Sequence, residues 1–537
     1  MLLDQRVREG HGEISCRAPR TLCDNRYVNA PSRAPGSGNL PATSTAFDAG
    51  ERVSAAAKKA AYIDERRCYW DAYARKQPGW DSPRRYYRRR LAELYRFVIP
   101  PGSRVLELGC GEGDLLAALQ PSEGVGIDLS PVRVEQGRRK YPQLTLMEGD
   151  AHDFDLGGKR FDFVVASDLI NDLWDVQQVL ERLHGCIHPG TRVVLNFYSR
   201  LWEGPRRGAE ALGIARPQLG QNWLTVPDVE NLLYLAGFET IQTRPEILWP
   251  MRTPGLDSLC NRYLVKMWPW NVFALTHFLV ARPAPKPAAT PEPRVSVVVP
   301  ARNEAGNIAH ILDRVPEMGG GTELIFVEGN SSDDTYAVIE QELARRQREY
   351  ALLPSGGAKL FRQTGKGKGD AVRLGFANAS GEVLMILDAD MTVAPEDLPR
   401  FYQAWRSGKG EYVNGVRLVY PMEDRAMRFF NLVGNKFFSL AFSWLLNQSI
   451  KDTLCGTKVL SRAHYEVIAH NRAYFGEIDP FGDFDLIFGA AKYNLKMVDL
   501  PIRYAERVYG DTNIQRWRHG IILLRMVILA MRRIKFV

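Results

Sequence analysis

The sequence predicts two α/β domains in one chain, and three observations lead to this prediction. At 537 residues the chain is longer than one hydrophobic core usually serves. Short apolar segments that run into polar residues alternate with helical patterns between residues 105 and 197, and again after Val295. The stretch 282–294 is rich in proline, which removes backbone donors and fixes φ, so it predicts a linker between the domains.

Composition excludes several classes of protein. The apolar fraction of 45% and the charged fraction of 25% are typical of globular chains. The seven cysteines stand singly, without the close pairs of zinc sites or small disulfide frameworks, which favours a reducing cytoplasm. The start lacks a signal-peptide pattern, and no uninterrupted apolar run reaches the roughly 18 residues of a spanning helix. We therefore expect a cytoplasmic protein.

The net charge of +8 favours anionic partners such as nucleotide phosphates or an anionic membrane surface. Residues 55–97 form a basic helical pattern that includes 84–90, for which a solvated face is expected rather than a nucleic-acid site. No nucleic-acid recognition module accompanies the charge, so no nucleic-acid partner is expected. Residues 1–54 lack apolar periodicity and predict a disordered tail.

The first domain is predicted to span residues 55–282 and to contain a parallel, doubly wound sheet. Its predicted strands are 105–108, 124–127, 144–148, 161–167 and 192–197. The predicted linker is 283–293, and the second domain spans 294–537 with strands 295–300, 324–328 and 383–388. The carboxyl ends of these strands are where ligands usually bind in such sheets.

The first predicted strand runs into a glycine-rich loop, with the sequence Val-Leu-Glu-Leu-Gly-Cys-Gly-Glu-Gly over 105–113. Such glycines let backbone N–H groups approach a ligand. Asp128 closes the second strand, where its carboxylate can accept hydrogen bonds from ribose hydroxyls, and Gly149-Asp-Ala151 closes the third. The combination resembles a class I S-adenosylmethionine-dependent methyltransferase from about Tyr95 to Pro283. A NAD-binding Rossmann domain shares the loop and the strand-end acid and is the competing interpretation.

The resemblance implies that the 107–113 loop holds the methionine end of S-adenosylmethionine, Asp128 the ribose and Asp150 the adenine edge. The implied cofactor-binding residues are Glu107, Gly109, Cys110, Gly111, Gly113, Asp128, Leu129, Asp150 and Ala151. Asp168 and Asn171-Asp172 would line the acceptor side, and helix capping by Asp168 and Asp172 is the alternative. The methyl acceptor leaves no motif, and a domain that binds the cofactor without turnover is a further alternative.

In the second domain, each predicted strand runs into polar or acidic residues, and Asp388-Ala-Asp390 follows the strand that begins at Val383. Carboxylates at strand ends suit a ligand that carries ribose and a diphosphate-bound divalent cation. Together with 301–304, the Glu328 loop and Lys366-Gly-Lys-Gly-Asp370, this order resembles a family 2 glycosyltransferase with the GT-A fold. The resemblance runs from about Arg294 almost to the C-terminus.

The resemblance implies a site for a UDP- or GDP-linked sugar, with Mg²⁺ or Mn²⁺ held by Asp388 and Asp390. The implied donor-binding residues are Pro300, Ala301, Arg302, Asn303, Glu304, Glu328, Asn330, Ser331, Lys366, Gly367, Asp370, Asp388, Ala389, Asp390, Arg507 and Asn513. Many relatives have two aspartates followed by glycine where this chain has Glu328-Gly-Asn, so the nucleoside is left open.

The segment 501–513 is similar to one in polyprenyl-phosphate sugar synthases, where a basic segment closes on the diphosphate. Arg507 fits this role, since a guanidinium forms charge-assisted hydrogen bonds to phosphate. Asn513 stands where those relatives often carry lysine, and Arg516, Arg518 or His519 could supply the charge.

The nature of the acceptor decides whether a base is needed. A lipid phosphate is already anionic at neutral pH, whereas a sugar hydroxyl needs a base. The candidate catalytic residues are Asp390, Asp483 and Asp452, and the last two could instead cap helices. Arg417 and Arg425 are candidate ligands of an acceptor phosphate, with simple surface charge as the alternative.

Two apolar segments are candidates for membrane contact. Residues 429–446 predict a helix with a narrow polar stripe, which suits either a buried core helix or one lying on a bilayer. Arg518, Arg525 and Arg532 fall on one face of a C-terminal helix, which suits either an interfacial helix or packing on the core. We expect peripheral association with the inner face of a membrane.

These patterns together predict a bifunctional enzyme. One half would transfer a hexose from a nucleotide sugar to polyprenyl phosphate, and the other would methylate an unknown acceptor. The alternative is transfer to a sugar hydroxyl of a glycan or glycolipid, with the methyltransferase half modifying the product.

Overall fold

The computed structural model describes residues 55–75, 83–212, 219–286, 291–348, 353–417, 419–420, 429–475, 482–505, 507, 509 and 516–537. The predicted tail at 1–54, Arg425 and Asn513 lie outside the described residues, and so do the side chains of Arg516, Arg518 and His519. The chain forms two compact units, Met1–Gln77 and Pro78–Val537. In the first, the described residues form helix α1 (Ala55–Arg75), in which the Arg66 guanidinium lies 3.2 Å from the Tyr62 ring centroid.

The second unit begins with helix α2 (Pro83–Val98), so the basic helical pattern predicted for 55–97 corresponds to two helices. Pro83 occupies the first helical position, where its missing N–H has no intrahelical partner to lose. One face of α2 is apolar: Tyr87, Leu91 and Tyr95 are buried in a core cluster that also includes Phe278. The aromatic rings of Tyr95 and Phe278 pack edge to face, with centroids 4.7 Å apart.

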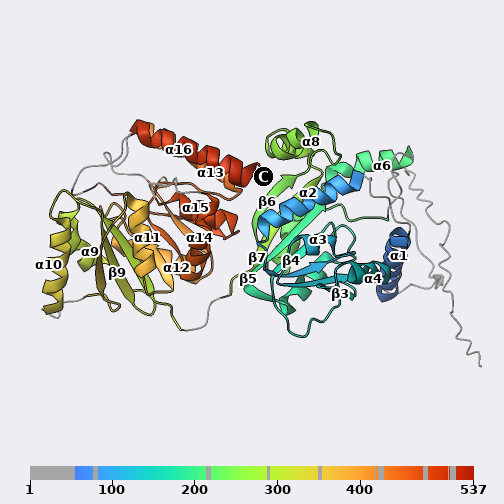
Figure 1. The fold of residues 1–537 in the computed structure, drawn as a ribbon, viewed down its shortest axis with the longest axis horizontal. Helices are drawn as coiled ribbons and strands as arrows, with labels where there is room; N and C mark the ends of the chain where they lie inside the picture. Colours follow the sequence, from blue (N-terminus) through green and yellow to red (C-terminus); the bar gives the residue numbers. More distant parts are fainter. Residues whose placement is uncertain are drawn as a thin grey trace, which may run out of the picture. The chain divides into compact units, whose positions relative to one another are not determined.

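The first sheet has the strand order β3-β2-β1-β4-β5-β7-β6 (Figure 1). Its strands are β1 (Arg104–Leu108), β2 (Glu123–Asp128), β3 (Thr145–Glu148), β4 (Phe161–Ser167), β5 (Ile187–Tyr198), β6 (Phe238–Glu246) and β7 (Thr276–Pro283). Strands β1 to β5 are parallel, which confirms the predicted doubly wound core. Strand β7 runs antiparallel to both β5 and β6, and strands β6 and β7 were not predicted.

The helices of this domain are α3 (Asp114–Ala118), α4 (Pro131–Lys140), α5 (Val176–Arg182), α6 (Glu203–Ala211), α7 (Val226–Leu235) and α8 (Leu256–Ser258). The helix after β4, α5, is capped by Asp175, whose side chain accepts a hydrogen bond from the Gln178 N–H. Asp168 and Asp172 therefore do not cap α5.

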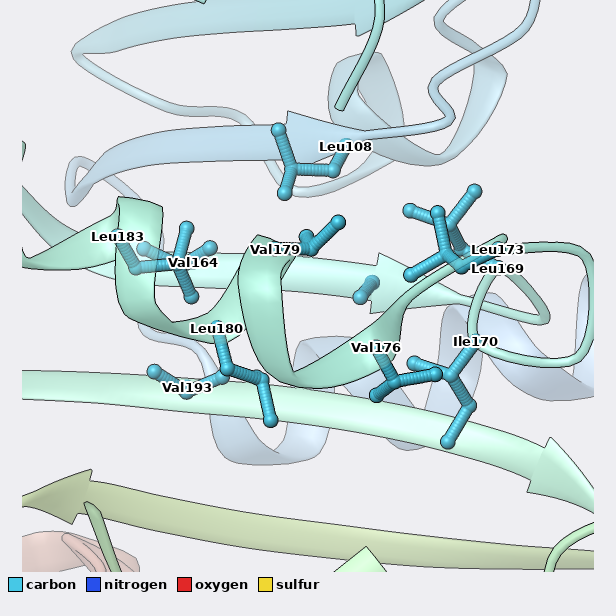
Figure 2. Close-up of a pocket in the computed structure, with 11 residues that line it drawn as sticks. Leu108, Val164, Leu169, Ile170, Leu173, Val176, Val179, Leu180, Leu183 and Val193 are labelled. Carbon is cyan, nitrogen blue, oxygen red and sulfur yellow. The ribbon is translucent and has the colours of Figure 1, made fainter. Parts of the chain in front are cut away.

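The core between α5 and the sheet is aliphatic. Figure 2 shows Leu108, Val164 and Val193 from strands β1, β4 and β5 around the helix residues Val179 and Leu180. The cavity among these side chains is only about 10 Å³. A void of this size without polar lining belongs to the core and has no room for a cofactor.

The second sheet has the order β10-β9-β8-β11-β13-β12-β14. Its strands are β8 (Val295–Ala301), β9 (Thr322–Glu328), β10 (Ala358–Arg362), β11 (Val383–Ile386), β12 (Tyr412–Val416), β13 (Lys458–Ser461) and β14 (Met497–Pro501). Strands β8 to β11 are parallel, and β13 is antiparallel to β11 and β12. The prediction of two α/β domains is confirmed, with four more strands here than were predicted.

The helices of this domain are α9 (Ile308–Arg314), α10 (Thr335–Arg348), α11 (Lys368–Asn378), α12 (Leu398–Arg406), α13 (Phe429–Leu446), α14 (Arg462–His470), α15 (Phe484–Lys492) and α16 (Arg516–Ala530). Helix α13 has the predicted bounds. Its polar stripe faces inward, because the Ser439 and Ser443 hydroxyls donate to the Ile450 carbonyl at 2.8 and 3.0 Å. No described helix combines the length and apolar character needed to cross a membrane.

Candidate active sites

The glycine loop after β1 depends on positive φ angles. Gly109, Gly111 and Gly113 have φ of 69°, 58° and 80°, a region that residues with a side chain rarely adopt. A Cβ at Gly111 would collide with the Arg133 guanidinium, and one at Gly109 would lie 2.9 Å from Leu169 Cδ1. The segment after β4 and the start of α4 therefore lie directly against this loop.

Asp128 holds the glycine loop from the end of the neighbouring strand. Its Oδ2 accepts from the Gly111 N–H at 2.7 Å, and its Oδ1 accepts from the Ser130 N–H at 3.0 Å. A carboxylate has about four acceptor positions, so these two bonds leave capacity for the hydroxyls of a ribose. The structure thus brings Asp128 and the glycine loop together.

Glu107 lies beneath the loop with almost no exposure. Among the described residues its Oε2 has no hydrogen-bond partner. Burial raises the pKa of Glu107 well above its usual range, and the nearby Asp128 charge adds to the shift. A buried acceptor without a donor is costly, and the amino group of S-adenosylmethionine is a donor that would satisfy it. The residues present therefore fit this cofactor.

Cys110 and Asp150 differ in their surroundings. Cys110 is buried, and its Sγ packs against Gly126 of β2, so it acts as a small loop residue. The Nε2 atom of His152 accepts from the Asp175 N–H at 3.1 Å. A neutral His152 therefore carries its proton on Nδ1, which lies 2.6 Å from Asp150 Oδ1 and donates to it. These two hydrogen bonds fix the Asp150 side chain against the start of α5.

Asp168 lies at the carboxyl end of β4 in a polar cluster. Its Oδ1 accepts from the Tyr87 hydroxyl at 2.8 Å and from Asn196 Nδ2 at 2.5 Å, and its Oδ2 from the Tyr198 hydroxyl at 3.4 Å. The rings of Tyr87 and Tyr198 stack with centroids 6.1 Å apart. Burial raises the pKa of Asp168 to about 6, although the three hydrogen bonds oppose the shift. Its φ of 53° is uncommon for a residue with a side chain.

Asn171 and Asp172, also predicted for the acceptor side, make different contacts. Asn171 is fully buried; its Nδ2 donates to the Asn222 carbonyl at 2.7 Å, and its Oδ1 accepts from the Tyr198 N–H at 3.1 Å. Asp172 accepts from Gln221 Nε2 at 3.4 Å. Asn171 thus holds the loop, whereas Asp168 is grouped with the two tyrosines.

In the second domain, the loops after β8 and β9 are tied together. The Asn303 N–H donates to Ser331 Oγ at 3.0 Å, and Asn303 Oδ1 accepts from the Ser332 N–H at 2.8 Å. Glu328 is buried at the end of β9 and accepts from the Ser331 N–H at 2.5 Å. These contacts gather the polar groups predicted for the nucleoside at one sheet edge.

The loop before α11 is arranged around Asp370. The Gly365 N–H donates to Asp370 Oδ2 at 3.0 Å, and Gln363 Nε2 donates to the Gly367 carbonyl at 2.8 Å. Gly367 has a φ of 86°, which allows the chain to turn into the helix. Lys366 is exposed to solvent.

Acids and cations alternate at the end of β11. Lys368 Nζ lies 2.5 Å from Asp388 Oδ1, and Arg507 Nη2 lies 2.7 Å from Asp390 Oδ2. Arg507 Nη1 also contacts Glu304 Oε1 at 3.1 Å, and the Thr392 hydroxyl donates to Asp390 Oδ1 at 2.8 Å. The predicted residues Glu304, Asp388, Asp390 and Arg507 therefore form one cluster.

The pKa values reflect this crowding of charge. Burial raises the pKa of Glu304 to about 7; Arg507 opposes the shift, while Asp390 and Asp388 add to it. Although burial lowers the pKa of Lys368, the charges of Asp388 and Asp483 raise it above its usual value overall. Burial raises the pKa of Asp388, but the charge of Lys368 outweighs this effect and holds the pKa below its usual value. In this cluster three acidic side chains, Glu304, Asp388 and Asp390, are thus in contact with two cations, Lys368 and Arg507.

A divalent cation suits this cluster. Within the described ranges, no three His, Cys, Asp or Glu side chains are grouped so that they could hold a metal ion by themselves. Mg²⁺ is commonly bound by one or two carboxylates together with substrate phosphates, so such a cage is not required. Asp388 and Asp390, which offer only oxygen ligands, fit a cation that arrives with a diphosphate.

Several residues of this site were not predicted. Gly456 lies so close to the Asp388–Lys368 pair that a Cβ there would collide with both side chains. Lys458 is buried, and its Nζ lies 3.2 Å from Oδ1 of Asp483, which was predicted. Lys368 could have been predicted from the sequence, since it lies between two glycines in the predicted donor-binding segment 366–370. Gly456, Lys458 and, in the first domain, Tyr87, Asn196 and Tyr198 carry no local sequence signal.

Arg417 and Asp452 are paired with each other. Arg417 donates from Nε and Nη2 to the two carboxylate oxygens of Asp452 at 2.7 and 2.9 Å, and both residues are buried. Although burial opposes it, Arg417 holds the pKa of Asp452 below its usual value. Such a two-point pair fixes the geometry of both side chains.

We expect Arg417→Met to lower the free energy of unfolding by about 3–5 kcal/mol at neutral pH, because it leaves a buried carboxylate without its partner. Urea unfolding followed by tryptophan fluorescence measures the change. Since the native pKa of Asp452 is depressed, the stabilisation is present above the unfolded pKa of about 3.9 and is lost as pH falls through the native value. The deficit of the variant should therefore shrink in acid.

The double variant Arg417→Met/Asp452→Leu is the matched control, because it removes both charges and should recover part of the loss. Equal stability of Arg417→Met and the wild type would contradict a structural role for the pair.

Comparison with known proteins is consistent with both sites. Residues 296–468 match the family model described as glycosyl transferase family 2, and residues 83–243 match the model described as methyltransferase domain. Glycosyltransferase AglJ of Haloferax volcanii is 28% identical over 231 residues, which cover 43% of this chain and 69% of that protein.

Two further relatives resemble the same half of the chain. The dolichol-phosphate mannosyltransferase of Pyrococcus furiosus is 28% identical over 229 residues, which cover 41% of this chain and 59% of that protein. The undecaprenyl-phosphate 4-deoxy-4-formamido-L-arabinose transferase of Edwardsiella ictaluri is 25% identical over 222 residues, which cover 41% of this chain and 62% of that protein. The chain thus spans about three fifths of the length of these two relatives.

Proposed function

Because the chain joins an S-adenosylmethionine-dependent methyltransferase domain to a family 2 glycosyltransferase domain, we propose that it glycosylates polyprenyl phosphate and methylates a second acceptor. The sugar donor is a UDP- or GDP-linked hexose. We place the boundary between the two domains in the proline-rich stretch 283–293. The two relatives named for dolichol phosphate and undecaprenyl phosphate support this choice of acceptor.

The observation that carries the proposal is the state of the two candidate bases. Asp452 is held by Arg417 at 2.7 Å, and Asp483 lies 3.2 Å from Lys458. Arg417 lowers the pKa of Asp452, which makes that carboxylate a weaker base, and Asp483 is engaged in an ion pair with Lys458. Both contacts suit an acceptor that needs no base. A phosphate monoester is already anionic at neutral pH, whereas a sugar hydroxyl must lose its proton.

Sugar transfer then proceeds as a single displacement. An oxygen of the acceptor phosphate attacks the anomeric carbon, the bond from that carbon to the nucleoside diphosphate breaks, and the configuration inverts. Glu328 and Asp370 hold the nucleoside, while Lys368 and Arg507 face the diphosphate and stabilise its leaving charge. A divalent cation at Asp388 and Asp390 would supply further neutralisation of that charge when bound.

Arg507 changes partners during this reaction. In the structure its guanidinium bridges Asp390 and Glu304. A diphosphate is a stronger competitor for a guanidinium than a single carboxylate, because it presents more charge and more acceptor oxygens. Arg507 therefore moves toward the donor as it binds, and the acidic groups that it leaves become available to the cation.

Methyl transfer takes place beside the glycine loop. Glu107, the loop and Asp128 hold S-adenosylmethionine, and the acceptor nucleophile lies near Asp168. When bound there, the cofactor would supply a methyl group on a sulfonium sulfur, and Asp168 would take the proton of the acceptor group that receives the methyl. Tyr87 and Tyr198 orient the Asp168 carboxylate.

A polyprenyl acceptor places the enzyme at a membrane, and we assign it to the cytoplasmic face as a peripheral protein. Helices α13 and α16 support this assignment. Each has buried residues on one side and an exposed apolar stripe on the other, Phe437, Leu440 and Trp444 on α13 and Ile521, Leu524 and Ile528 on α16. Lys436 and Arg525 are exposed basic side chains on the same two helices, which suits anionic lipid.

The first prediction of this function concerns the donor. With labelled UDP- and GDP-hexoses, polyprenyl phosphate and Mg²⁺ or Mn²⁺, the wild type should form a lipid-linked sugar from one of the two donors. Asp390→Asn should reduce the rate by about a hundredfold or more, as loss of a preorganised charge at the reacting diphosphate does. The surface variant Glu396→Gln, which loses only an exposed pair with Arg314, should keep the rate. Nucleotide release without lipid product would redirect the assignment to a hydroxyl acceptor.

The second prediction concerns the cofactor. Asp128→Ala should weaken the binding of S-adenosylmethionine by about tenfold or more, because it removes charge-assisted hydrogen bonds to the ribose. Isothermal titration calorimetry measures the dissociation constant. Asp155→Ala, an exposed acid in the turn before β4, should leave affinity unchanged. Preferred binding of NAD by the wild type would instead support a Rossmann dehydrogenase domain.

The third prediction concerns pH. In a mixture that contains labelled S-adenosylmethionine, donor and polyprenyl phosphate, label should enter the lipid fraction if the glycolipid is the methyl acceptor. The rate should rise with pH through about 6, since only the ionised Asp168 can take a proton. Asp168→Asn should abolish labelling yet retain cofactor binding, and Asp172→Asn should retain both. An unchanged pH profile in Asp168→Asn would rule out Asp168 as the base.

A further inference from the structure

The segment 251–273 of the methyltransferase domain is built with its polar groups inward. Asn261 is buried; its Oδ1 accepts from the Leu248 and Trp249 N–H groups, both at 2.8 Å, and its Nδ2 donates to the Trp249 carbonyl at 2.6 Å. Lys266 is also buried and pairs with the carboxylate of Glu246. These contacts fasten the segment to the domain from the inside.

The outer side of the same segment is apolar. Trp268 is 82% exposed, the largest exposed fraction among the large apolar residues of the described chain. The exposed apolar side chains of the segment are Met251, Leu256, Leu259, Tyr263, Met267, Trp268, Trp270, Val272 and Phe273. So many exposed apolar side chains within one short segment are typical of an interaction site. These nine side chains are called the aromatic face below.

The exposed charges around the aromatic face are positive. Arg252 and Arg262 are exposed, whereas the one acid of the segment, Asp257, is partly buried. Tryptophan and tyrosine are enriched where protein meets the headgroup region of a bilayer, because their rings are apolar with a polar edge. Arginine beside them favours anionic lipid. This chemistry suits a lipid surface.

The segment that carries the aromatic face contacts α13 and the end of the chain that follows α16. All of these lie within the compact unit Pro78–Val537. Trp444 Nε1 of α13 donates to the Lys266 carbonyl at 3.2 Å, and the rings of Tyr263 and Phe536 lie 5.1 Å apart. Leu256, Leu259 and Tyr263 repeat at intervals of three and four residues, as do the exposed apolar residues of α13 and α16.

We propose that the aromatic face is a membrane-docking surface through which the methyltransferase domain itself binds the headgroup region of an anionic bilayer. If the aromatic face binds a membrane, methylation takes place where a lipid-linked acceptor lies. Only this consequence rests on the proposed function. Binding to vesicles does not depend on that consequence and can be measured by itself.

The test is flotation of the full chain with vesicles of phosphatidylcholine and phosphatidylglycerol, with pure phosphatidylcholine for comparison. The wild type should float with the anionic vesicles. Trp268→Glu/Trp270→Glu should weaken this binding by about tenfold or more, since two rings leave the apolar phase. Tyr234→Glu is the matched control: Tyr234 lies on α7 of the same domain, is 77% exposed and lies outside the aromatic face, so binding should persist.

Unchanged affinity for S-adenosylmethionine in all variants shows that the fold is intact. Wild-type flotation that Trp268→Glu/Trp270→Glu does not weaken would overturn the proposal and assign binding to α13 and α16 alone. A wild type that does not float but forms a dimer, with a monomeric double variant in the ultracentrifuge, would also overturn it and identify a second copy as the partner.

Sugar transfer to a short, water-soluble isoprenyl phosphate separates this proposal from the proposed function. If the double variant loses vesicle binding but keeps this transfer, both the aromatic face and the function are supported. If the wild type floats but does not transfer sugar, the proposed function fails while the docking surface stands.

Discussion

The ion pair between Lys368 and Asp388 organises the glycosyltransferase site. Lys368 opens helix α11, where the helix dipole and partial burial both disfavour a positive charge. It is retained because carboxylates surround it: Asp388 at 2.5 Å, and Asp483 close enough to raise its pKa further. The turn at Gly456 must then lack a side chain, because a Cβ there would meet both members of the pair. One interaction thereby constrains three chain segments that are far apart in sequence.

The two domains stabilise the acidic side chains at their strand ends in different ways. In a parallel sheet the carboxyl ends of strands meet at one edge, so acids placed there are brought together and repel each other. In the methyltransferase domain they are stabilised by backbone N–H groups and hydroxyls, as at Asp128 and Asp168. In the glycosyltransferase domain, Asp388 and Asp390 are stabilised by cations, whereas Glu328 and Asp370 accept from backbone N–H groups. The cations at Asp388 and Asp390 suit the proposed ligand, because a diphosphate needs positive charge and a sulfonium does not.

The sequence was sufficient for the parallel strands β1 to β5, β8, β9 and β11 and their loops, because buried parallel strands are short apolar runs that end in polar motifs. It was not sufficient for β6, β7, β10 and β12 to β14, and the side chains of β10 are only partly buried. Strand β6 alternates polar and apolar residues and contains Pro245, so it lacks that signal. The partners of the predicted acids were also missed, since Lys458 and Asp483 are 25 positions apart and only the fold brings them together. Arg425 and Asn513 stay predictions.

The pairing of Arg417 with Asp452 is compatible with a role for Arg417 in binding the acceptor. Asp452 uses Nε and one hydrogen of Nη2, whereas a guanidinium has five N–H donors. A phosphate can therefore bind Nη1 and the second Nη2 hydrogen without separating the pair, and the buried carboxylate is never left unpaired. Holding the guanidinium by one edge also fixes the direction of the other. In the proposed function, Asp452 positions Arg417 and is not the base, which agrees with an acceptor that arrives already ionised.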